Sequence, residues 1–361
     1  SLLFLITIAM IYAATGTVNM ADLAVKLGDL DPSTQLMLHL MLLVAFGIKA
    51  AVFPLSFWLP DSYPTAPAPV TAVFAGLLTK VGVYAMVRTE TLLFPGDRIN
   101  SLLMVVAGLT MVVGILGALA QTDIKRMLSF TLVSHIGYMV FGLAVGSVIG
   151  IGSAVFYVVH HITVQTSLFL VTGLIERRGG TANMDRLGGL AKLSPILAVL
   201  YSIPAINLGG IPPFSGFLGK LGLLEAGAEL GTPLAYVLVG ASVLTSLLTL
   251  LVMARVWNRA FWRTPEDAVH PDPILLATGT DGSALRTSGD VTEKSTGKFS
   301  GRGAVDLLPR TMVYPTVGLV ALGVALTVLA GTLFSLSDHA AQDLIDRTPY
   351  IEAVLGEGAG Q

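Results

Sequence analysis

Long apolar runs dominate this chain and restrict the class of fold that it can adopt. Hydrophobic residues make up 53% of the sequence and charged residues only 12%, whereas an ordinary soluble domain has about a quarter charged residues. A helix needs about 20 mostly apolar residues to cross a bilayer. The sequence therefore predicts an all-α, polytopic membrane protein with about nine transmembrane helices. The predicted spans, the first of them partial, are Ser1–Ala14, Leu36–Leu59, Val70–Arg88, Ser101–Ala120, Met127–Ile149, Ile151–Ile175, Ser194–Glu225, Pro233–Trp257 and Met312–Ser335.

The chain begins at Ser1, already inside an apolar run and with no basic leader before it. A signal peptide carries a positively charged region ahead of its apolar stretch. We therefore expect a truncated start, with further residues upstream, rather than a signal peptide.

Two of the predicted spans are interrupted. Pro54 lies late in the second apolar run, and because proline removes a backbone donor and clashes with the preceding turn, the helix must kink or break there. The segment Ser194–Glu225 is too long for a simple span and holds Gly210, Pro212 and Pro213 in its middle. Broken helices are tolerated at membrane depth only where protein or water satisfies the freed backbone groups, and paired breaks indicate a transporter site. We therefore expect two discontinuous helices and an internal repeat.

Lysines lie within the apolar runs, where charge is costly. Lys49 lies in the middle of Leu36–Leu59, Lys80 lies in Val70–Arg88, and Lys220 follows the second break. A charged lysine at a helix centre in lipid costs about 2.5 to 3.5 kcal/mol, so it is kept mainly where water or a partner compensates. A buried lysine can also give up and regain a proton. The lysines predict an ion or proton path, and the alternative is that Lys49 and Lys80 only snorkel to the interface.

Three histidines lie in further apolar stretches. His160 and His161 are adjacent, so on a helix they point about 100° apart and cannot line one path equally. We expect one to face the path and the other to pack or to hydrogen bond to a neighbouring helix. His161 shares a helix face with Tyr157 and Gln165, and His135 lies on a separate run. Histidine titrates near neutral pH, which suits a proton relay, and the alternative for each is a structural hydrogen bond.

Metal, nucleotide and nucleic-acid sites are not indicated. The histidines lack carboxylates or cysteines at ligand spacing, and an adjacent pair on a helix cannot easily chelate one ion. The glycine-rich stretch from Gly146 to Gly152 follows no strand, so a nucleotide-binding loop is not supported. The chain has no cysteine, and its net charge of −2 gives no argument for nucleic acid. We expect no cofactor, no metal and no nucleic-acid partner.

Basic residues gather in alternate loops. The positive-inside rule assigns the richer set to the cytoplasm and the C-terminal tail to the outside. We expect a membrane core over residues 1–262, a cytoplasmic and disordered loop over 263–311, a last span over 312–337 and an extracytoplasmic tail over 338–361. The set assigned to the cytoplasm before the long loop is Lys125, Arg126, Arg177, Arg178, Arg186, Lys192, Arg259 and Arg263, and the opposite set is Lys26, Arg88, Arg98 and Arg347.

Four motifs occur in a fixed order along the chain. They are residues 57–70 (FWLPDSYPTAPAPV), 78–84 (LTKVGVY), 123–129 (DIKRMLS) and 134–138 (SHIGY). In these motifs the chain resembles the antiporter-like membrane subunits shared by multi-subunit Mrp sodium/proton antiporters and respiratory NADH–quinone oxidoreductase. The resemblance implies a fold of about fourteen helices with two inverted five-helix repeats, each with one broken helix.

The resemblance also implies roles for the buried residues. It makes Lys49 the lysine of the first broken helix, paired with a glutamate on an earlier helix that is outside this chain. It makes Lys80 the connecting lysine of a central relay and His161 the histidine of the helix that links two half-channels. Lys220 becomes the terminal lysine of the second broken helix. Many relatives carry lysine at the position of Gln165, so here the link beyond His161 is expected to run through water.

Two further stretches, residues 210–220 (GIPPFSGFLGK) and 256–262 (VWNRAFW), are most similar to the Mrp branch of the family. The resemblance implies a non-enzymatic, proton-translocating subunit that exchanges Na+ and H+ together with other antiporter subunits in a hetero-oligomeric complex of the bacterial cytoplasmic membrane. One alternative is a proton-pumping membrane subunit of NADH–quinone oxidoreductase or a related hydrogenase complex. A second is a scaffold whose polar residues only bond helices together.

Overall fold

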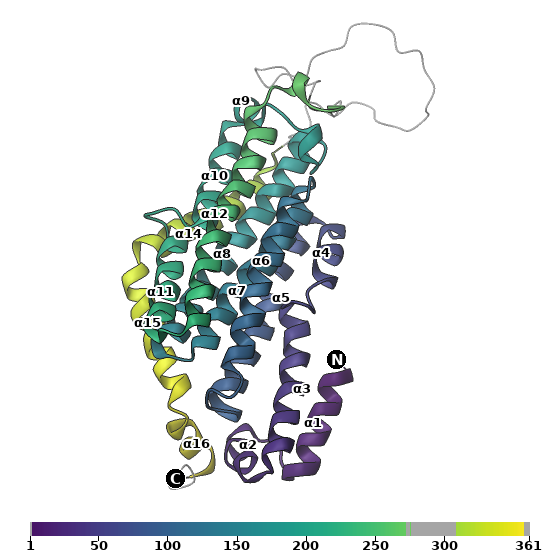
Figure 1. Ribbon diagram of the computed structural model, residues 1–361. Helices are drawn as coiled ribbons and strands as arrows, with labels where there is room; N and C mark the ends of the chain where they lie inside the picture. The colour runs from purple at the N-terminus through teal and green to yellow at the C-terminus, as the bar shows by residue number, and fades with distance from the viewer. Residues whose placement is uncertain (1, 272–274, 276–307, 357–361) are drawn as a thin grey trace, which may run out of the picture.

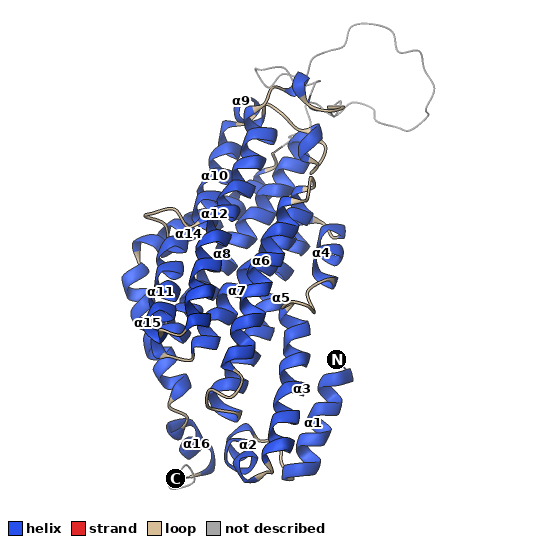
Figure 2. Ribbon diagram, in the orientation of Figure 1, coloured by secondary structure: helices blue, strands red, loops and turns tan. Residues whose placement is uncertain are grey.

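The computed structural model describes residues 2–271, 275 and 308–356, which form a bundle of helices (Figures 1 and 2). Among these residues extended backbone pairs only at one isolated antiparallel bridge, between Asp123 and Asn183. The predicted all-α class is confirmed. The helices are α1 (Leu2–Thr15), α2 (Met20–Lys26), α3 (Pro32–Ala50), α4 (Trp58–Ser62), α5 (Ala68–Arg88), α6 (Asn100–Leu119), α7 (Ile124–Val145), α8 (Val148–Gly179), α9 (Leu190–Leu193), α10 (Pro195–Gly209), α11 (Ser215–Leu230), α12 (Pro233–Val256), α14 (Arg310–Val328), α15 (Ala330–Ile345) and α16 (Thr348–Leu355), with π-helical turns η3 (Thr89–Leu93) after α5 and η5 (Trp257–Trp262) after α12.

The lengths of these helices confirm a polytopic membrane protein. In the described part of the chain, seven helices are long and apolar enough to cross a membrane, or eight if the bent pair α1 and α2 forms one span. The predicted count of nine is not confirmed. The difference arises because the segment Ser194–Glu225 divides into α10 and α11, which have 15 and 16 residues and are each too short for a span.

Polar caps fix where the long helices begin. The side chain of Asp31 accepts a hydrogen bond from the amide of Ser33 at the start of α3, and Thr232 accepts one from Ala235 at the start of α12. Each cap satisfies a backbone N–H that has no partner within its own helix. Both helices also carry proline in their first turn, where its missing N–H costs nothing. The helices therefore start at defined positions beside the short loops.

Two helices are broken inside the bundle, as predicted. The helix α3 ends at Ala50, Ala51 adopts a left-handed conformation with φ of 62°, and the chain resumes as α4. The helix α10 ends at Gly209, Gly210 has φ of 80°, and the chain resumes as α11. In Figure 1 α3 enters the bundle from the end that carries α2 and α16, whereas α10 enters from the opposite end, beside α9. The two broken helices therefore run in from opposite ends, as an inverted repeat requires.

The helices α7 and α8 form the centre of the bundle. Nearly every residue of α7 is buried, and α7 packs against α6, α8, α11 and α12. Glycine allows close approach in these contacts: a Cβ added to Gly137 of α7 would lie 2.5 Å from Cγ of Met111 and 2.8 Å from the carbonyl oxygen of Ala107, both on α6. Small residues let helix backbones approach closely in membranes, where packing drives association. Gly137 therefore fixes how near α6 lies to α7.

Gly137→Ala is expected to destabilise the protein by about 1 to 3 kcal/mol, because the added methyl group overpacks the contact between α6 and α7. Gly240→Ala on α12 is the matched control, since a Cβ there meets nothing within 4 Å. Alanine is the better helix former by up to about 1 kcal/mol, so the control is expected to be neutral or slightly stabilising. Thermal unfolding of the detergent-solubilised protein measures both changes, and equal midpoints for the two variants would contradict the packing.

Basic residues divide between two ends of the bundle, which we name the α9 end and the α16 end. The start of α7, the end of α8, α9 and the end of α12 lie at the α9 end (Figure 1). The helix α2, the start of α6 and α16 lie at the α16 end. The two sets of basic loop residues predicted from the sequence therefore lie at opposite ends of the bundle. At the α9 end are Lys125, Arg126, Arg177, Arg178, Arg186, Lys192, Arg259 and Arg263, and on elements of the α16 end are Lys26, Arg88, Arg98 and Arg347.

The C-terminal part differs from the boundaries drawn on the sequence. The predicted span 312–337 consists of two helices, α14 and α15, and helix continues to Ile345 because α15 is amphipathic and buries Ser337 and Ala341 against the bundle. It packs along α8, and α16 packs against α2. The predicted tail is therefore largely helical as far as Leu355. Most of the predicted loop 263–311 lies outside the described residues.

Candidate functional site

Lys220 lies at the break between α10 and α11 and binds the end of α10. Its ammonium group donates to the carbonyl oxygens of Leu208 at 3.0 Å and Gly209 at 3.3 Å, and to the hydroxyl of Ser246 on α12 at 2.9 Å. The last carbonyls of a helix have no partner within it, so a nearby lysine can satisfy them. Only 4% of Lys220 is exposed. The three donors of the ammonium group thus meet three acceptors in the interior.

Glycine and proline make room for this arrangement. A Cβ added to Gly210 would lie 3.0 Å from Cδ of Lys220, and its left-handed φ also favours glycine. Pro212 and Pro213 lie in the gap between the two helices, where no helical hydrogen bond is needed. Pro54 occupies the corresponding gap between α3 and α4. Each proposed break residue therefore lies in an interruption.

His160 joins α8 to the second broken helix. Its Nδ1 lies 3.0 Å from the hydroxyl of Ser215, the first residue of α11. Asn207 of α10 accepts from the amide of Gly216 at 2.9 Å, so α8, α10 and α11 meet in one hydrogen-bonded group. The Nε2 of His160 is buried and has no hydrogen-bond partner among the described residues. His160 therefore keeps one ring nitrogen available beside the break.

His161 faces α7 instead, which agrees with the expected angle between the adjacent histidines. Its ring stacks on His135 with the ring centroids 5.2 Å apart, and both ring nitrogens of His161 are buried without a partner among the described residues. His135 has partners, because its Nδ1 lies 2.6 Å from the hydroxyl of Tyr157. His161 is close enough to both Lys80 and Lys220 to interact electrostatically with each. His135 interacts with the same two lysines, so the stacked pair as a whole lies near both.

Tyr138 connects this histidine pair with Lys220. The ammonium of Lys220 lies 5.1 Å from the centre of the Tyr138 ring, within the range of a cation–π interaction. The rings of Tyr138 and Tyr157 are 5.4 Å apart, and Tyr157 in turn contacts His135. A continuous set of buried polar and aromatic side chains therefore runs from α11 through α7 to α8.

Lys80 lies at the other side of this set, on α5. It is only 5% exposed, and its ammonium donates to the carbonyl oxygen of Ala75 on its own helix at 2.8 Å. A snorkelling lysine reaches the membrane interface, whereas this side chain ends inside the bundle. The adjacent Thr79 has a buried hydroxyl with no hydrogen-bond partner among the described residues. The Lys80 side chain is thus buried inside the bundle and held by its own helix.

Lys49 lies beside the first break, where the proline in its apolar run predicts an interruption. The helix α3 ends one residue later, at Ala50, and the side chain of Lys49 is exposed in the described chain. A Cβ added to Gly82 would lie 2.5 Å from the amide nitrogen of Ala50, so α5 packs against the end of α3 near Lys80. Lys49 therefore lies at the depth of Lys80, but outside the buried set.

A polar face on α12 contributes to the site and was not identified from the sequence. Tyr138 donates to the carbonyl oxygen of Ser242 at 2.6 Å, and Thr249 lies 3.4 Å from Nε2 of His135. Together with Ser246, which binds Lys220, these residues recur every three or four positions on an otherwise apolar helix. That spacing places them on one helix face and is the signal that could have revealed them.

No metal centre is built among the residues that the structure describes. Within them no three histidine, cysteine, aspartate or glutamate side chains lie close enough to hold an ion. The polar groups instead form hydrogen-bonded and stacked contacts between helices. Such a set can pass a proton or an electrostatic change between neighbouring groups.

Comparison with known proteins identifies close similarity to one family. Residues 1–249 match the family described as NADH:quinone oxidoreductase/Mrp antiporter, transmembrane. The D subunit of the Na(+)/H(+) antiporter of Alkalihalophilus pseudofirmus is 40% identical over 360 residues, which cover 99% of this chain and 66% of the relative. The chain therefore spans slightly less than two thirds of that relative's length. This similarity confirms the predicted resemblance to the Mrp branch and, within it, to the D subunits that the two stretches at residues 210–220 and 256–262 indicate.

Solved structures agree with this assignment. A chain in the structure of the Mrp complex from Dietzia sp. DQ12-45-1b has a TM-score of 0.83 and 35% identity, covering 98% of this chain and 67% of that chain. A chain of the archaeal membrane-bound sulfane sulfur reductase has a TM-score of 0.80 and 25% identity, covering 98% and 65%. Sequence, fold and buried polar residues thus lead to one conclusion: the chain belongs to the family of membrane subunits shared by NADH:quinone oxidoreductase and Mrp antiporters.

Proposed function

We propose that this chain translocates protons as a D-type component of a multi-subunit sodium/proton antiporter in the bacterial cytoplasmic membrane. One observation carries the proposal: two buried lysines, Lys80 and Lys220, lie on either side of the stacked pair His135 and His161. Ionisable residues inside a membrane protein are costly and mark ion or proton paths. The name of the relative from Alkalihalophilus pseudofirmus supports sodium/proton exchange with other subunits as the setting.

In the proposed relay, Lys49 gains or loses a proton as an acidic partner from outside this chain approaches or withdraws. Its position at the end of α3, beside Gly82 of α5, lets this change act on Lys80. The change then passes to His161, whose unprotonated ring nitrogen has no partner among the described residues and can accept a proton, and on to His135. His160 and Tyr138 extend the path toward the second break.

Lys220 exchanges the proton with the opposite side in this mechanism. Its three hydrogen bonds go to acceptors only, so release of a proton from the ammonium group must break one of them. Because two of these acceptors are the freed carbonyls of α10, proton release is coupled to the conformation of the break. The α9 end faces the cytoplasm in this proposal, following the positive-inside rule.

A redox-driven pump is the second candidate function. The likeness to a chain of the sulfane sulfur reductase supports the same fold in a respiratory complex. The identity of 25% is lower than the 40% shared with the D subunit of the antiporter, which favours the antiporter. Exchange driven by a sodium gradient alone, without a reductant, separates the two functions.

Lys80→Ala tests the proposed function. It is expected to reduce sodium-dependent proton exchange by at least about tenfold, because a positioned proton carrier typically contributes more than that. Exchange is measured in vesicles that contain the full antiporter complex. Lys192→Ala is the matched control, since Lys192 is an exposed lysine at the α9 end. Wild-type exchange by an assembled Lys80→Ala complex would instead favour the scaffold alternative.

A further inference from the structure

A second buried ionisable pair lies outside the relay, near the α16 end. The Nε2 of His39 on α3 is 2.7 Å from Oε1 of Glu90, in the π-helical turn η3 after α5. Both residues are more than nine-tenths buried, with 4% of His39 and 8% of Glu90 exposed. The His39 ring stacks on Phe94 at a centroid distance of 4.4 Å, which holds its orientation. The pair is thus a fixed contact between two membrane helices.

The second carboxylate oxygen of Glu90 is unsatisfied. Its Oε2 is buried and has no hydrogen-bond partner among the described residues. Glu90 lines a cavity of about 100 Å³ with Asn100 and with Gly146 at the end of α7. An unpaired acceptor inside a membrane protein costs free energy unless water or a proton satisfies it. The free oxygen therefore points to a bound proton or water.

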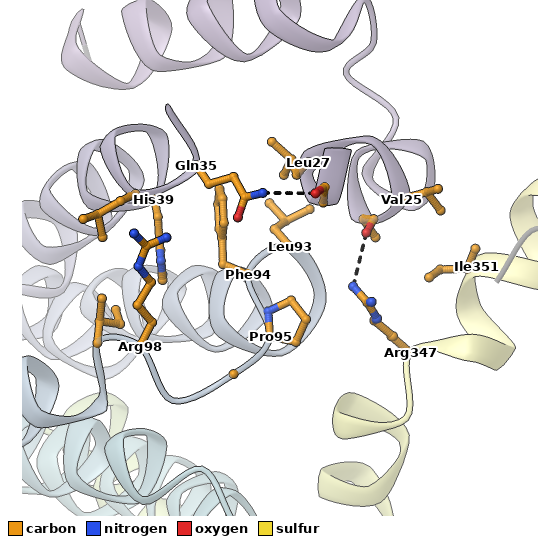
Figure 3. Close-up of a pocket in the computed structure, with 15 residues that line it drawn as sticks. Val25, Leu27, Gln35, His39, Leu93, Phe94, Pro95, Arg98, Arg347 and Ile351 are labelled. Carbon is orange, nitrogen blue, oxygen red and sulfur yellow. Dashed lines mark hydrogen bonds between the residues drawn. The ribbon is translucent and has the colours of Figure 1, made fainter. Parts of the chain in front are cut away.

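His39 lines a different cavity, of about 330 Å³, which opens between exposed residues at the α16 end. Figure 3 shows His39, Phe94, Arg98 and Arg347 around this cavity. The volume is enough for several water molecules. The two cavities share Pro95 and Gly96 in their walls, and the hydrogen bond between His39 and Glu90 joins one to the other. The pair therefore separates two spaces that can hold water.

We propose that His39 and Glu90 form a proton-binding site at the α16 end, through which protons exchange between the extracytoplasmic solvent and the interior of the bundle. This inference rests on the proposed proton transport and adds a residue pair at one end of it. A proton arriving through the larger cavity binds the imidazole of His39. It then moves along the 2.7 Å contact to the carboxylate of Glu90, which lines the smaller cavity.

The position of the pair on α3 and α5 connects it to the relay. His39 precedes Lys49 by ten residues and Glu90 follows Lys80 by ten residues, which is about 15 Å along each helix. Because α3 and α5 are antiparallel, the buried pair lies nearer to the α16 end than both lysines do. The same two helices therefore carry ionisable groups at two depths. Lys49 and Lys80 lie at the depth of the break, and His39 and Glu90 lie nearer to the solvent.

A proton fits this site better than a metal cation does. Sodium, like other hard cations, prefers several oxygen ligands, whereas the site offers a histidine nitrogen and one free carboxylate oxygen. The side chains of Arg98 and Arg347 also line the cavity in front of His39. Both arginines donate to backbone carbonyls, Arg98 to Pro32 and Arg347 to Ala24.

Other charged groups near the pair are on the helices that pack against η3. On α2, Lys26 and Asp22 form an exposed ion pair with each other at 2.9 Å. The guanidinium of Arg88 lies over the ring of Tyr350. The helix α15 carries Asp338, His339 and Asp343, of which only Asp338 is partly buried, against Gly152 of α8.

Glu90→Gln tests the site in the full antiporter complex reconstituted into liposomes. Glutamine keeps a hydrogen-bond partner for His39 and cannot bind the proton. The variant is expected to slow exchange by about tenfold, and to flatten its dependence on extracytoplasmic pH while the opposite pH is held constant. Glu229→Gln is the matched control, because Glu229 is an exposed carboxylate at the same end of the bundle.

Infrared difference spectra provide a readout that does not depend on transport. Acidifying the wild-type complex is expected to produce the carbonyl band of a buried protonated carboxylic acid. That band should be missing in Glu90→Gln and present in Glu229→Gln. If Glu90→Gln does not assemble, His39→Gln is measured instead and is expected to change the pH dependence of exchange and of the band.

The outcomes separate this inference from the proposed function. If Lys80→Ala keeps wild-type exchange, the proposed function fails. If Lys80→Ala loses exchange while the assembled Glu90 or His39 variant keeps the wild-type rate, pH dependence and carbonyl band, only the external proton site is overturned.

Discussion

Lys220→Arg is expected to abolish most sodium-dependent proton exchange while the complex still assembles. Arginine keeps the positive charge and supplies donors for the carbonyl oxygens of Leu208 and Gly209, but it does not release a proton at accessible pH. A group that only holds α10 and α11 together would tolerate this change. A proton carrier would not, and its loss costs about 100-fold in rate by comparison with other positioned proton donors. The exchange rate in proteoliposomes and the amount of assembled complex are measured together.

Two further variants show whether a loss of exchange in Lys220→Arg comes from the lost proton carrier. Lys220→Gln retains a donor without charge, and it is expected to lose exchange to a similar extent. Lys192→Arg makes the same chemical change as Lys220→Arg at an exposed site and is expected to have no effect. Substantial exchange by an assembled Lys220→Arg complex would remove Lys220 from the relay and leave it a structural role at the helix break.

The sequence predicted the broken helices because their causes are local. Gly210 and the prolines after it cannot continue a helix, and the structure ends α10 at Gly209. Proline at position 54 similarly indicated the first break. The exposure of the Lys49 side chain could not be predicted, because an apolar run does not show at which residue the helix stops or which side chains its neighbours cover. The structure ends α3 at Ala50, and this places Lys49 in the last turn.

Burial of Glu90 was missed for a related reason. The predicted span ended at Arg88, since a charged residue there is typical of a membrane boundary. The helix instead continues through a π-helical turn to Leu93, and His39 on α3 supplies a partner for the carboxylate. Partners from distant parts of a chain are decided by packing, which periodicity along one helix does not reveal. The spacing of Ser242, Ser246 and Thr249 was visible, but only the structure shows that this face meets Lys220 and His135.

His161→Phe is expected to lose about 100-fold in exchange with almost no change in stability, a combination that few buried histidines allow. Its two ring nitrogens make no hydrogen bond to the described residues, so phenylalanine leaves no partner unsatisfied and can keep the stacking on His135. His135→Phe is the contrasting variant, because it removes the partner of the Tyr157 hydroxyl and should cost about 1 to 3 kcal/mol in stability as well as transport. Thermal unfolding and exchange are measured for each.

The double variant decides whether the two histidines act in one relay. If both histidines carry the same proton, His161→Phe already blocks its path, and replacing His135 as well slows exchange no further. The loss of exchange in the double variant should then about equal the loss in His161→Phe alone. Independent paths would give losses that multiply. His160→Gln is also measured, because His160 faces Ser215 and not His135. If His160 acts separately from the histidine pair, the losses of exchange from His160→Gln and His161→Phe should multiply. Full exchange by His161→Phe would break the connection between Lys80 and Lys220 on which the relay depends.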